Sequence, residues 1–387
     1  MLALLLARRG VPVLLLEEHA DFERDFRGDT VHPSTLEVLD AIGLASGLLA
    51  LPHGEIRAVT LETPEGVMEV ARLDRAGGKF PFIAMLPQAR FLEYVTREAA
   101  RFDAFRLEMH AHVHELIEEG GAVRGVRVRT PDGTGWREVR APLIVAADGR
   151  FSRLRTLSGL PSVKSSAPMD VLWLRLPKKP SDPVDPGLFA VGPGGLVVTL
   201  TRPDDWQVGL IIAKGGYAAY KAKGLGAVRD AIARIKPFFR DRLDALADWH
   251  QIALLSVESS RVTRWHRPGL LLIGDAAHVM TPVGGVGINV AIQDAVAAAE
   301  LLERPLLEHR VTDADLAAVQ RAREWPARVT QWIQGQVQQR VVAPTLASDE
   351  AHFRVPFLLR ILPRIPLLSN LPARFVARGL GSRLPRR

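Results

Sequence analysis

The stretch that decides the fold runs from Leu271 to Asn289 and reads Leu-Leu-Ile-Gly-Asp-Ala-Ala-His-Val-Met-Thr-Pro-Val-Gly-Gly-Val-Gly-Ile-Asn. Residues Leu270 to Ile273 form a short apolar run of the kind that fills the interior of a parallel sheet. Gly274 ends this run. Asp275 follows at the carboxyl end of the predicted strand, where open α/β sheets bind ligands. A strand, an acidic turn and a glycine-rich loop in this order predict a site for a large phosphate-bearing cofactor.

A helix is predicted to begin directly after the loop. Three glycines follow Pro282, and they let backbone N–H groups approach a flat ring closely because no Cβ stands in the way. From Ile288 onward, apolar residues recur at helical spacing. The unpaired N–H groups of Gly287 to Asn289 and the positive end of the helix dipole would therefore face the contents of the loop. The three glycines are Gly284, Gly285 and Gly287.

The order Gly-Asp-Ala-Ala-His, Pro, Gly-Gly-x-Gly-x-Asn resembles the second FAD signature of the single-component (class A) FAD-dependent aromatic monooxygenases, the p-hydroxybenzoate hydroxylase-like family. A lone Gly-Asp pair would favour an ordinary strand-to-helix turn, but the longer string favours the family. The resemblance implies an α/β fold: a Rossmann-like FAD-binding domain with an inserted, mostly antiparallel sheet domain that carries the substrate. The FAD contacts that it implies in this stretch are Gly274, Asp275, Pro282, Gly285, Gly287, Ile288 and Asn289.

A second segment agrees with the first. The apolar run Leu143 to Ala147 precedes an Asp-Gly pair that begins at Asp148. It resembles the family's Asp-Gly motif, which lies between the flavin and the pyridine nucleotide. The alternative is an ordinary Asp-Gly turn capped by Ser152. Arg153 and Arg155 favour the site, because they place two phosphate-seeking cations beside the aspartate.

The amino terminus departs from the family pattern. Val11 to Leu16 predict a strand, and the resemblance places Glu17 where the family binds the adenosine ribose. Such an acid should follow a G-x-G-x-x-G loop by about 20 residues. Here Leu2 to Arg9 predict the last two turns of the helix after that loop, so the first strand and the loop are missing. A start codon placed too late, a real truncation, or a degenerate paralogue that no longer binds FAD would each explain this. The intact later motifs favour the first.

Two more FAD contacts are implied by the resemblance. Arg27 matches an arginine near the ribityl and phosphate region, and its alternative is a solvated loop residue. Gln88 matches a ribityl-contacting glutamine, and its alternative is an ordinary residue at a helix start. We assign no role to His32. For His278 we expect a structural hydrogen bond in the turn rather than a role as catalytic base.

Between the cofactor segments, residues 165–260 alternate strand-like runs with Pro/Gly clusters. They predict the inserted substrate domain. The FAD-binding domain would then be discontinuous, with residues 1–164 and 261–345, followed by a basic amphipathic C-terminal segment at 346–387. Eight of the 50 Lys and Arg residues follow Glu350 and no acid does, which leaves 42 basic and 43 acidic residues before it. Because the body is near neutral, the high pI of about 10.0 does not indicate nucleic-acid binding.

The C-terminal segment and the start of the chain bear on location. Residues 351–387 mix arginine with leucine and isoleucine, so they either pack along the FAD domain or attach reversibly to an anionic membrane surface. At the start, Arg8 and Arg9 follow the apolar residues, which is the wrong order for an export signal. No run approaches the roughly 18 uninterrupted apolar residues of a membrane span. The chain has no cysteine, which fits a reducing compartment, so we expect a cytoplasmic protein.

The resemblance implies a reaction. It is hydroxylation of an aromatic or phenolic small molecule with NADPH or NADH and O2, through a flavin hydroperoxide. The flavin carries that chemistry, so no side chain is assigned a catalytic role, and the sequence shows no metal-ligand pattern. Two alternatives remain open. One is another FAD oxidoreductase of the same fold, namely an epoxidase, a halogenase or an isoprenoid reductase. The other is a non-catalytic paralogue.

Overall fold

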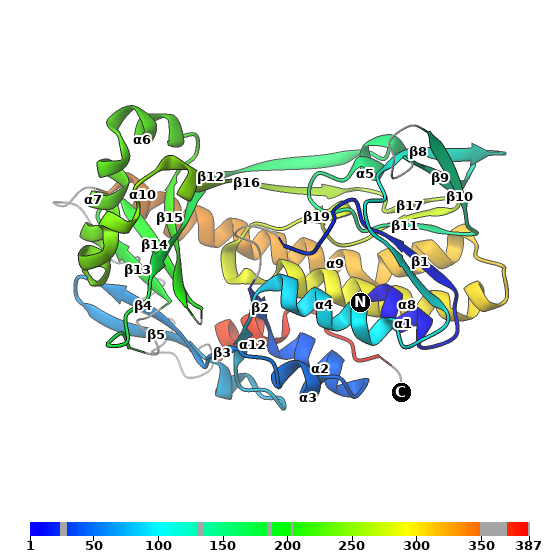
Figure 1. The fold of residues 1–387 in the computed structure, drawn as a ribbon, viewed down its shortest axis with the longest axis horizontal. Coiled ribbons are helices and arrows are strands. Elements are labelled where there is room, and N and C mark those ends of the chain that lie inside the picture. The colour runs from blue at the N-terminus through cyan, green and yellow to red at the C-terminus, as the bar shows by residue number, and fades with distance from the viewer. Residues whose placement is uncertain (24–28, 130–134, 184–187, 203, 349–369, 386–387) are drawn as a thin grey trace.

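A computed structural model describes residues 1–23, 29–129, 135–183, 188–202, 204–348 and 370–385. Figure 1 shows a large sheet with its own helices at one end and a group of helices with smaller sheets at the other. The long strands β12 and β16 run from one part toward the other. This is the predicted α/β arrangement, in which a sheet-rich part adjoins a cofactor-binding part.

Two parallel strand pairs form the centre of the cofactor-binding part. β1 (Val13–Leu16) pairs with β7 (Phe105–Glu108), and β11 (Ile144–Ala146) pairs with β18 (Leu270–Leu272). On its other side, β18 pairs with the short antiparallel strand β17 (His266–Arg267). The apolar runs before Glu17, before Asp148 and before Asp275 are therefore strands, as predicted. In each of these pairs the two strands run in the same direction, so the acidic residues that follow them lie at the carboxyl ends, where α/β sheets bind ligands.

Helices cover these strands. α1 (Leu2–Ala7) buries Leu4 and Leu5 against α4 (Gln88–Ala99) and α8 (Gly287–Leu307). Gly10, at a φ of +79°, ends the turn after α1, as expected of a C-terminal stop. The other helices of the described residues are α2 (Pro33–Ala41), α3 (Ala45–Leu49), α5 (Arg153–Ser158), α6 (Tyr217–Lys223), α7 (Leu225–Ile235), α9 (Asp313–Val337), α10 (Ala343–Ala347) and α12 (Leu371–Arg378).

Two smaller antiparallel sheets complete this part. One has the order β10-β9-β8 and the other β2-β6-β3. Their strands are β8 (Val113–Glu119), β9 (Ala122–Arg129), β10 (Trp136–Arg140), β2 (Thr30–Val31), β6 (Ile83–Met85) and β3 (Gly54–Ile56). The second sheet matters for the site, because it brings the segment after Arg27 beside the start of α4.

The large sheet has eight strands in the order β19-β16-β12-β15-β14-β13-β4-β5, and every pair except β13–β4 is antiparallel. It extends beyond residues 165–260, because β4, β5 and β19 come from segments that the sequence assigned to the FAD-binding domain. The strands are β12 (Ser162–Pro177), β13 (Phe189–Gly192), β14 (Gly195–Thr201), β15 (Asp205–Ala213), β16 (Ala253–Val262), β4 (Ala58–Thr63), β5 (Gly66–Arg72) and β19 (His278–Val279).

The two faces of this sheet pack against different partners. One face contributes Leu172, Val208 and their neighbours to a core that α7 closes with Val228 and Ile232. After α7 the chain continues in 3₁₀ turns at Pro237–Ala245, which add Phe239 and Leu243 to this core. The opposite face packs against Val283 of the glycine loop. We call this second surface, made by the inward side chains of β12, β14, β15 and β16, the loop-side face.

Helix α8 is the core helix of the cofactor-binding part. Among the described residues, the segment Val283–Leu307 is long and apolar enough to cross a membrane by composition. About two thirds of its apolar window is nevertheless buried inside the fold, as in the core helix of a globular protein. Membrane contact of residues 351–387 stays a prediction, because residues 351–369 lie outside the described ones. The described part, in α12, buries Ala373 and Ala377 completely against the body.

Gly269, in the turn between β17 and β18, offers a test of how this turn packs against β9. Its φ is +79°, and a Cβ at this position would lie 1.9 Å from the carbonyl oxygen of Val123 on β9. We expect Gly269→Ala to lower the free energy of unfolding by about 3 kcal/mol, since the clash is with backbone. Urea denaturation measures this. Gly226→Ala is the control, because a Cβ on Gly226 would have no other atom within 4 Å. It should be neutral or slightly stabilising.

Candidate functional site

The Gly-Asp turn packs directly on α8. Gly274 has a φ of +58°, and a Cβ there would lie 3.1 Å from the Cβ of Ala291, so glycine allows the turn to sit directly on the helix. Its N–H donates to Asp294 Oδ2 at 3.0 Å. Asp275 follows in a 3₁₀ turn at Gly274–Ala276 and is partly buried. The turn therefore places Asp275 after the carboxyl end of β18, where it was predicted, on a segment that packs against α8.

The glycine loop leaves the start of α8 without a cap. Pro282 accepts a hydrogen bond from the N–H of Gly285, at 3.0 Å, and Gly284 and Gly285 have φ values of +78° and +63°. The N-cap residue is Val286, which provides no side-chain cap. The first N–H groups of a helix have no intrahelical acceptor, so those of Gly287 to Asn289 are available to a ligand. The helix dipole makes negative charge or carbonyl oxygen favourable there.

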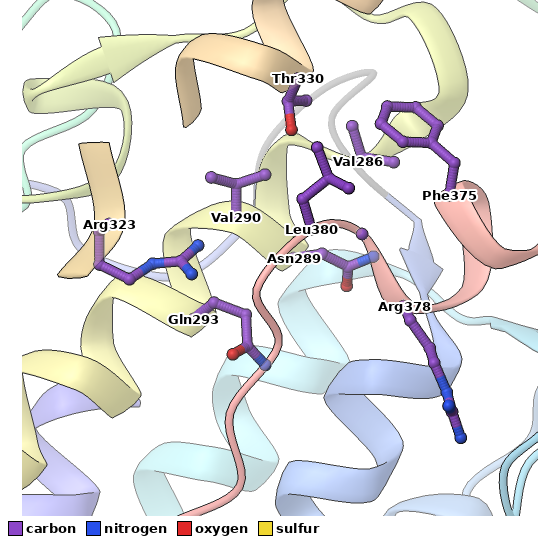
Figure 2. A pocket seen from close by; sticks show the side chains of 10 residues that line it. Val286, Asn289, Val290, Gln293, Arg323, Thr330, Phe375, Arg378 and Leu380 are labelled. Carbon is purple, nitrogen blue, oxygen red and sulfur yellow. The ribbon is translucent and has the colours of Figure 1, made fainter. Parts of the chain in front are cut away.

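Asn289 adds a side-chain donor to this helix start. Its Oδ1 accepts a 2.7 Å hydrogen bond from Thr35 Oγ1 on α2, which fixes the orientation of the amide. Its Nδ2 has no hydrogen-bond partner, although the residue is only 3% exposed. Figure 2 shows Asn289 and Gln293 at a small cavity between α8 and the C-terminal segment, with Phe375 and Arg378 on the other side. A buried donor without an acceptor is a place where a bound group can supply one.

A buried ion pair fixes the turn to the helices. Asp294 is fully buried; its Oδ2 accepts from Gly274 and lies 2.6 Å from His278 Nε2, and its Oδ1 accepts from Arg323 Nε at 2.9 Å. Burial alone would raise the pKa of Asp294, but His278 and Arg323 outweigh it and hold that pKa below its usual value. The structural role expected for His278 is confirmed, with its partner on α8 rather than within the turn.

The Asp-Gly segment is tied to the Gly-Asp turn through an arginine. Arg155 donates to the carbonyl oxygen of Asp275 at 3.0 Å, which brings the two motifs together. Ser152 is the N-cap of α5, because its hydroxyl accepts from the N–H of Arg155 at 2.9 Å. The carboxylate of Asp148 accepts hydrogen bonds from Ser152 Oγ and from the N–H of Leu154, so it supports this cap. This geometry gives Asp148 the structural role that was the alternative at the sequence level. Its contact with a cofactor stays a prediction.

The remaining predicted positions lie at two places. Glu17 follows β1, and its Oε1 pairs with His19 Nδ1 at 2.7 Å, at the end of the strand where the ribose was predicted. Gln88 begins α4, and its N–H lies 3.4 Å from Asp29 Oδ1 beside β2. Thr30, the residue after Asp29, would have its Oγ1 3.6 Å from a Cβ on Gly285. Gln88 is therefore near the glycine loop, because it lies beside the Asp29–Thr30 segment. Arg27 lies outside the described residues.

The C-terminal segment reaches the site from the far end of the chain. His32 is 1% exposed, and its Nδ1 lies 2.7 Å from the carbonyl oxygen of Val376 on α12. Because a carbonyl can only accept, Nδ1 carries the proton. Burial lowers the pKa of His32 to about 4, against smaller raising effects of the Val376 and Gly285 backbones. His32 is therefore neutral at pH 7. Arg323 provides a second contact between the body and the C-terminal segment, because it donates to the carbonyl oxygen of Gly381 at 3.0 Å.

Comparison with known proteins decides the family. The model of the FAD binding domain family matches residues 1–333 of the chain. A 6-methylpretetramide 4-monooxygenase of Streptomyces rimosus is 34% identical over 81% of this chain and 75% of its own length. The chain belongs to the FAD-dependent monooxygenase family.

Two further matches show the breadth of this family. A dialkyldecalin synthase of Streptomyces rugosporus is 27% identical over 76% of this chain, and the chain spans only 61% of that protein's length. The OxyS anhydrotetracycline hydroxylase of Streptomyces rimosus has a TM-score of 0.76 at 22% identity, over 99% of this chain and 74% of the other. The second match shows a shared fold. The expected Rossmann-like domain with an inserted sheet domain is thus confirmed.

The residues of this monooxygenase fit FAD at the start of α8. Gly285 and Gly287 keep the loop free of side chains, and the uncapped N–H groups of Gly287 to Asn289 suit the carbonyl edge of a flavin ring. The orphaned Nδ2 of Asn289 offers one more donor. Asp275 lies at the carboxyl end of β18, where a carboxylate can accept from ribityl hydroxyls. Each of these positions was predicted from sequence.

Several residues that support the site were not identified from the sequence. Asp294 contacts the Gly-Asp turn, Thr35 contacts Asn289, and Arg323 pairs with Asp294. These three residues lie on three different helices. The C-terminal residues Val376 and Gly381 were considered only as tail. A signal was present for Asp294 alone, because a carboxylate among the apolar residues of α8 is costly to bury unless it is paired.

Removal of the Asp294 carboxylate should destabilise the monooxygenase strongly. Asp294→Ala leaves the guanidinium of Arg323 buried without its partner, so we expect the free energy of unfolding to fall by about 3–5 kcal/mol. Urea denaturation followed by circular dichroism measures this. Glu308→Gln is the matched control, since it breaks an exposed pair with Arg304 and should change stability little. A similar small effect of both variants would contradict the role of Asp294.

His32 should make stability depend on pH. Its folded pKa of about 4 lies below the unfolded value of 6.5, so the unfolded chain takes up the proton first as the pH falls. Stability is then lost between about pH 6.5 and 4, by on the order of 3 kcal/mol. His32→Asn should remove this loss, as measured by urea denaturation across that pH range. His250→Asn, at a fully exposed side chain, should retain it.

Proposed function

We propose that this chain hydroxylates an aromatic or phenolic small molecule with NAD(P)H and O2. The observation that carries the proposal is the uncapped start of α8 directly beside the loop-side face. Val283, within the glycine loop, packs against the apolar cluster of that face. A flat group held at Gly287 to Asn289 would therefore have the sheet as its neighbour, and a substrate on the sheet would lie within reach of it.

Some residues of the site are suited to bind the cofactor, and others exclude water from it. Asp275, Gly285, Gly287 and Asn289 would hold FAD, and FAD when bound would supply hydride acceptance and oxygen activation. The dipole of α8 stabilises negative charge on whatever carbonyl edge faces it. The loop-side face offers mostly apolar side chains, which keep water from the reacting atoms.

The names of the relatives support an oxygenation. The proteins that match this chain include ones named for 4-monooxygenation of 6-methylpretetramide and for hydroxylation of anhydrotetracycline. A dialkyldecalin synthase also matches this chain, over 76% of its length, so family membership by itself does not fix the reaction. The choice between NADH and NADPH, the cytoplasmic location and membrane contact of residues 351–387 stay predictions.

The test has two stages. The purified chain is mixed with FAD, and its visible spectrum is recorded after removal of free cofactor. We expect flavin absorbance near one FAD per chain. The loaded protein is then given NADPH or NADH, O2 and a panel of phenols, and we expect substrate-dependent consumption of both co-substrates with a product that has gained one oxygen atom.

Other outcomes are informative as well. A protein that stays colourless would contradict the proposal and favour the non-catalytic alternative. Loss of NAD(P)H without O2 consumption or oxygen in the product would instead indicate a reductase. A halogenated product that requires a halide would indicate a halogenase, and an epoxide would indicate an epoxidase.

A further inference from the structure

Helix α9 has two faces of different character. In Figure 1 it runs alongside α8 across the middle of the molecule. Residues three or four apart lie on the same side of a helix, so a buried row leaves an outward row between its members. The buried row is Leu316, Val319, Arg323, Ala327, Thr330 and Gln334. The outward row, which we call the α9 stripe, is Arg321, Trp325, Arg328 and Trp332, and all four are exposed.

Two tryptophans dominate the α9 stripe. Trp325 and Trp332 are seven residues apart, close to two helical turns, so both indoles project from the same side of the helix. They are 63% and 64% exposed. Indole rings normally bury a large area in a core or an interface. Single exposed apolar side chains are ordinary, but large ones gathered on one surface indicate an interaction site.

The inward face fixes the orientation of α9. Arg323 donates to the buried carboxylate of Asp294 at 2.9 Å. Gln334 Nε2 donates to the carbonyl oxygens of Thr281 and Val283, at 2.9 and 2.8 Å. A rotation of the helix that buried the tryptophans would break these contacts. The exposure of the α9 stripe is therefore a property of the folded protein.

The charge of the α9 stripe indicates the charge of its partner. Arg321 and Arg328 alternate with the two tryptophans, and Arg340 follows on the π-helical turn Gln338–Val342. The stripe itself contains no acidic residue. Glu324, at its flank, lies 3.7 Å from Arg328 and is itself half-buried. A partner with negative charge is complementary to this surface.

A second copy of this chain fits the α9 stripe poorly. Specific protein interfaces cover about 800 Å² on each partner and involve roughly 20–30 residues a side, far more than one row of a single helix. A twofold axis midway between Trp325 and Trp332 would also bring the Arg328 residues of both copies close together, with like charges. A membrane surface has neither requirement. Tryptophan prefers the boundary between lipid and water, and arginine binds anionic headgroups.

We propose that the α9 stripe docks this protein reversibly on an anionic phospholipid surface. Trp325 and Trp332 enter the headgroup region, and Arg321 and Arg328 pair with lipid phosphates. This inference goes beyond the proposed function and does not depend on it, because the docking requires no reaction. It is also separate from the contact predicted for residues 351–387, because α9 ends before that segment.

The experiment measures sedimentation of the full chain with vesicles, in the presence of FAD. One preparation contains equal parts of phosphatidylglycerol and phosphatidylcholine, and the other contains phosphatidylcholine alone. We expect the wild type to bind the anionic vesicles at least about tenfold more tightly. Trp325→Ser combined with Trp332→Ser should weaken this binding by about tenfold or more. Arg321→Gln combined with Arg328→Gln should remove most of the preference for anionic lipid.

Trp136→Ser is the matched control. Trp136 is 55% exposed on β10, so this variant also removes an exposed indole, but from a different surface. It should bind both vesicle preparations as the wild type does. Thermal unfolding checks that each variant is folded, and little change is expected because the replaced side chains are exposed. Quenching of wild-type tryptophan fluorescence by brominated acyl chains tests insertion without any variant, and we expect it with the anionic vesicles.

Three results would overturn the inference. The first is the absence of vesicle binding or of quenching in the wild type. The second is equal binding by the wild type and the double tryptophan variant, which would assign the contact to another segment such as residues 351–387. The third is a dimer that forms without vesicles and is lost in the double tryptophan variant, which would show that the α9 stripe binds a second copy.

Discussion

The buried carboxylate of Asp294 is the interaction on which the rest of the site depends. It holds Gly274 through a backbone N–H, His278 through the imidazole and Arg323 through the guanidinium, with no exposure to solvent. A lone charge at this depth would be strongly unfavourable, so the three donors and the carboxylate require one another. Their mutual requirement fixes the Gly-Asp turn on α8 and thereby the position of the glycine loop that follows. Arg323 carries the same constraint to Gly381, near the end of the chain.

The large sheet gains its function from having two unlike faces. Helix α7 closes one face with Val228 and Ile232, and that core supplies stability in the ordinary way. The other face meets the glycine loop through Val283 and the π-helical turn through Val342. The sheet thus serves both as a folding core and as the surface that faces the cofactor loop.

The motifs around Asp275 and Gly287 could be predicted because they are local. A strand, a turn and a helix start follow one another within 19 residues, and the glycines report backbone geometry directly. The structure confirms the strand at β18 and the uncapped start of α8, and it gives Gly284 and Gly285 positive φ angles. Asp148 shows the limit of the same reasoning. Its motif was recognised, but only the fold revealed that its carboxylate accepts from Ser152 and from the N–H of Leu154 at the start of α5.

The sequence by itself determined the family, the cofactor-binding segments and the presence of an inserted sheet, since periodicity and glycine placement are properties of short stretches. It also determined the charge of the C-terminal segment, though not where that segment packs. Only the tertiary structure decided that β4 and β5 join the sheet, that α12 contacts His32, and that Arg323 reaches Gly381. The physical reason is that such pairings join residues tens to hundreds of positions apart, and strand register and helix packing across the whole chain select them.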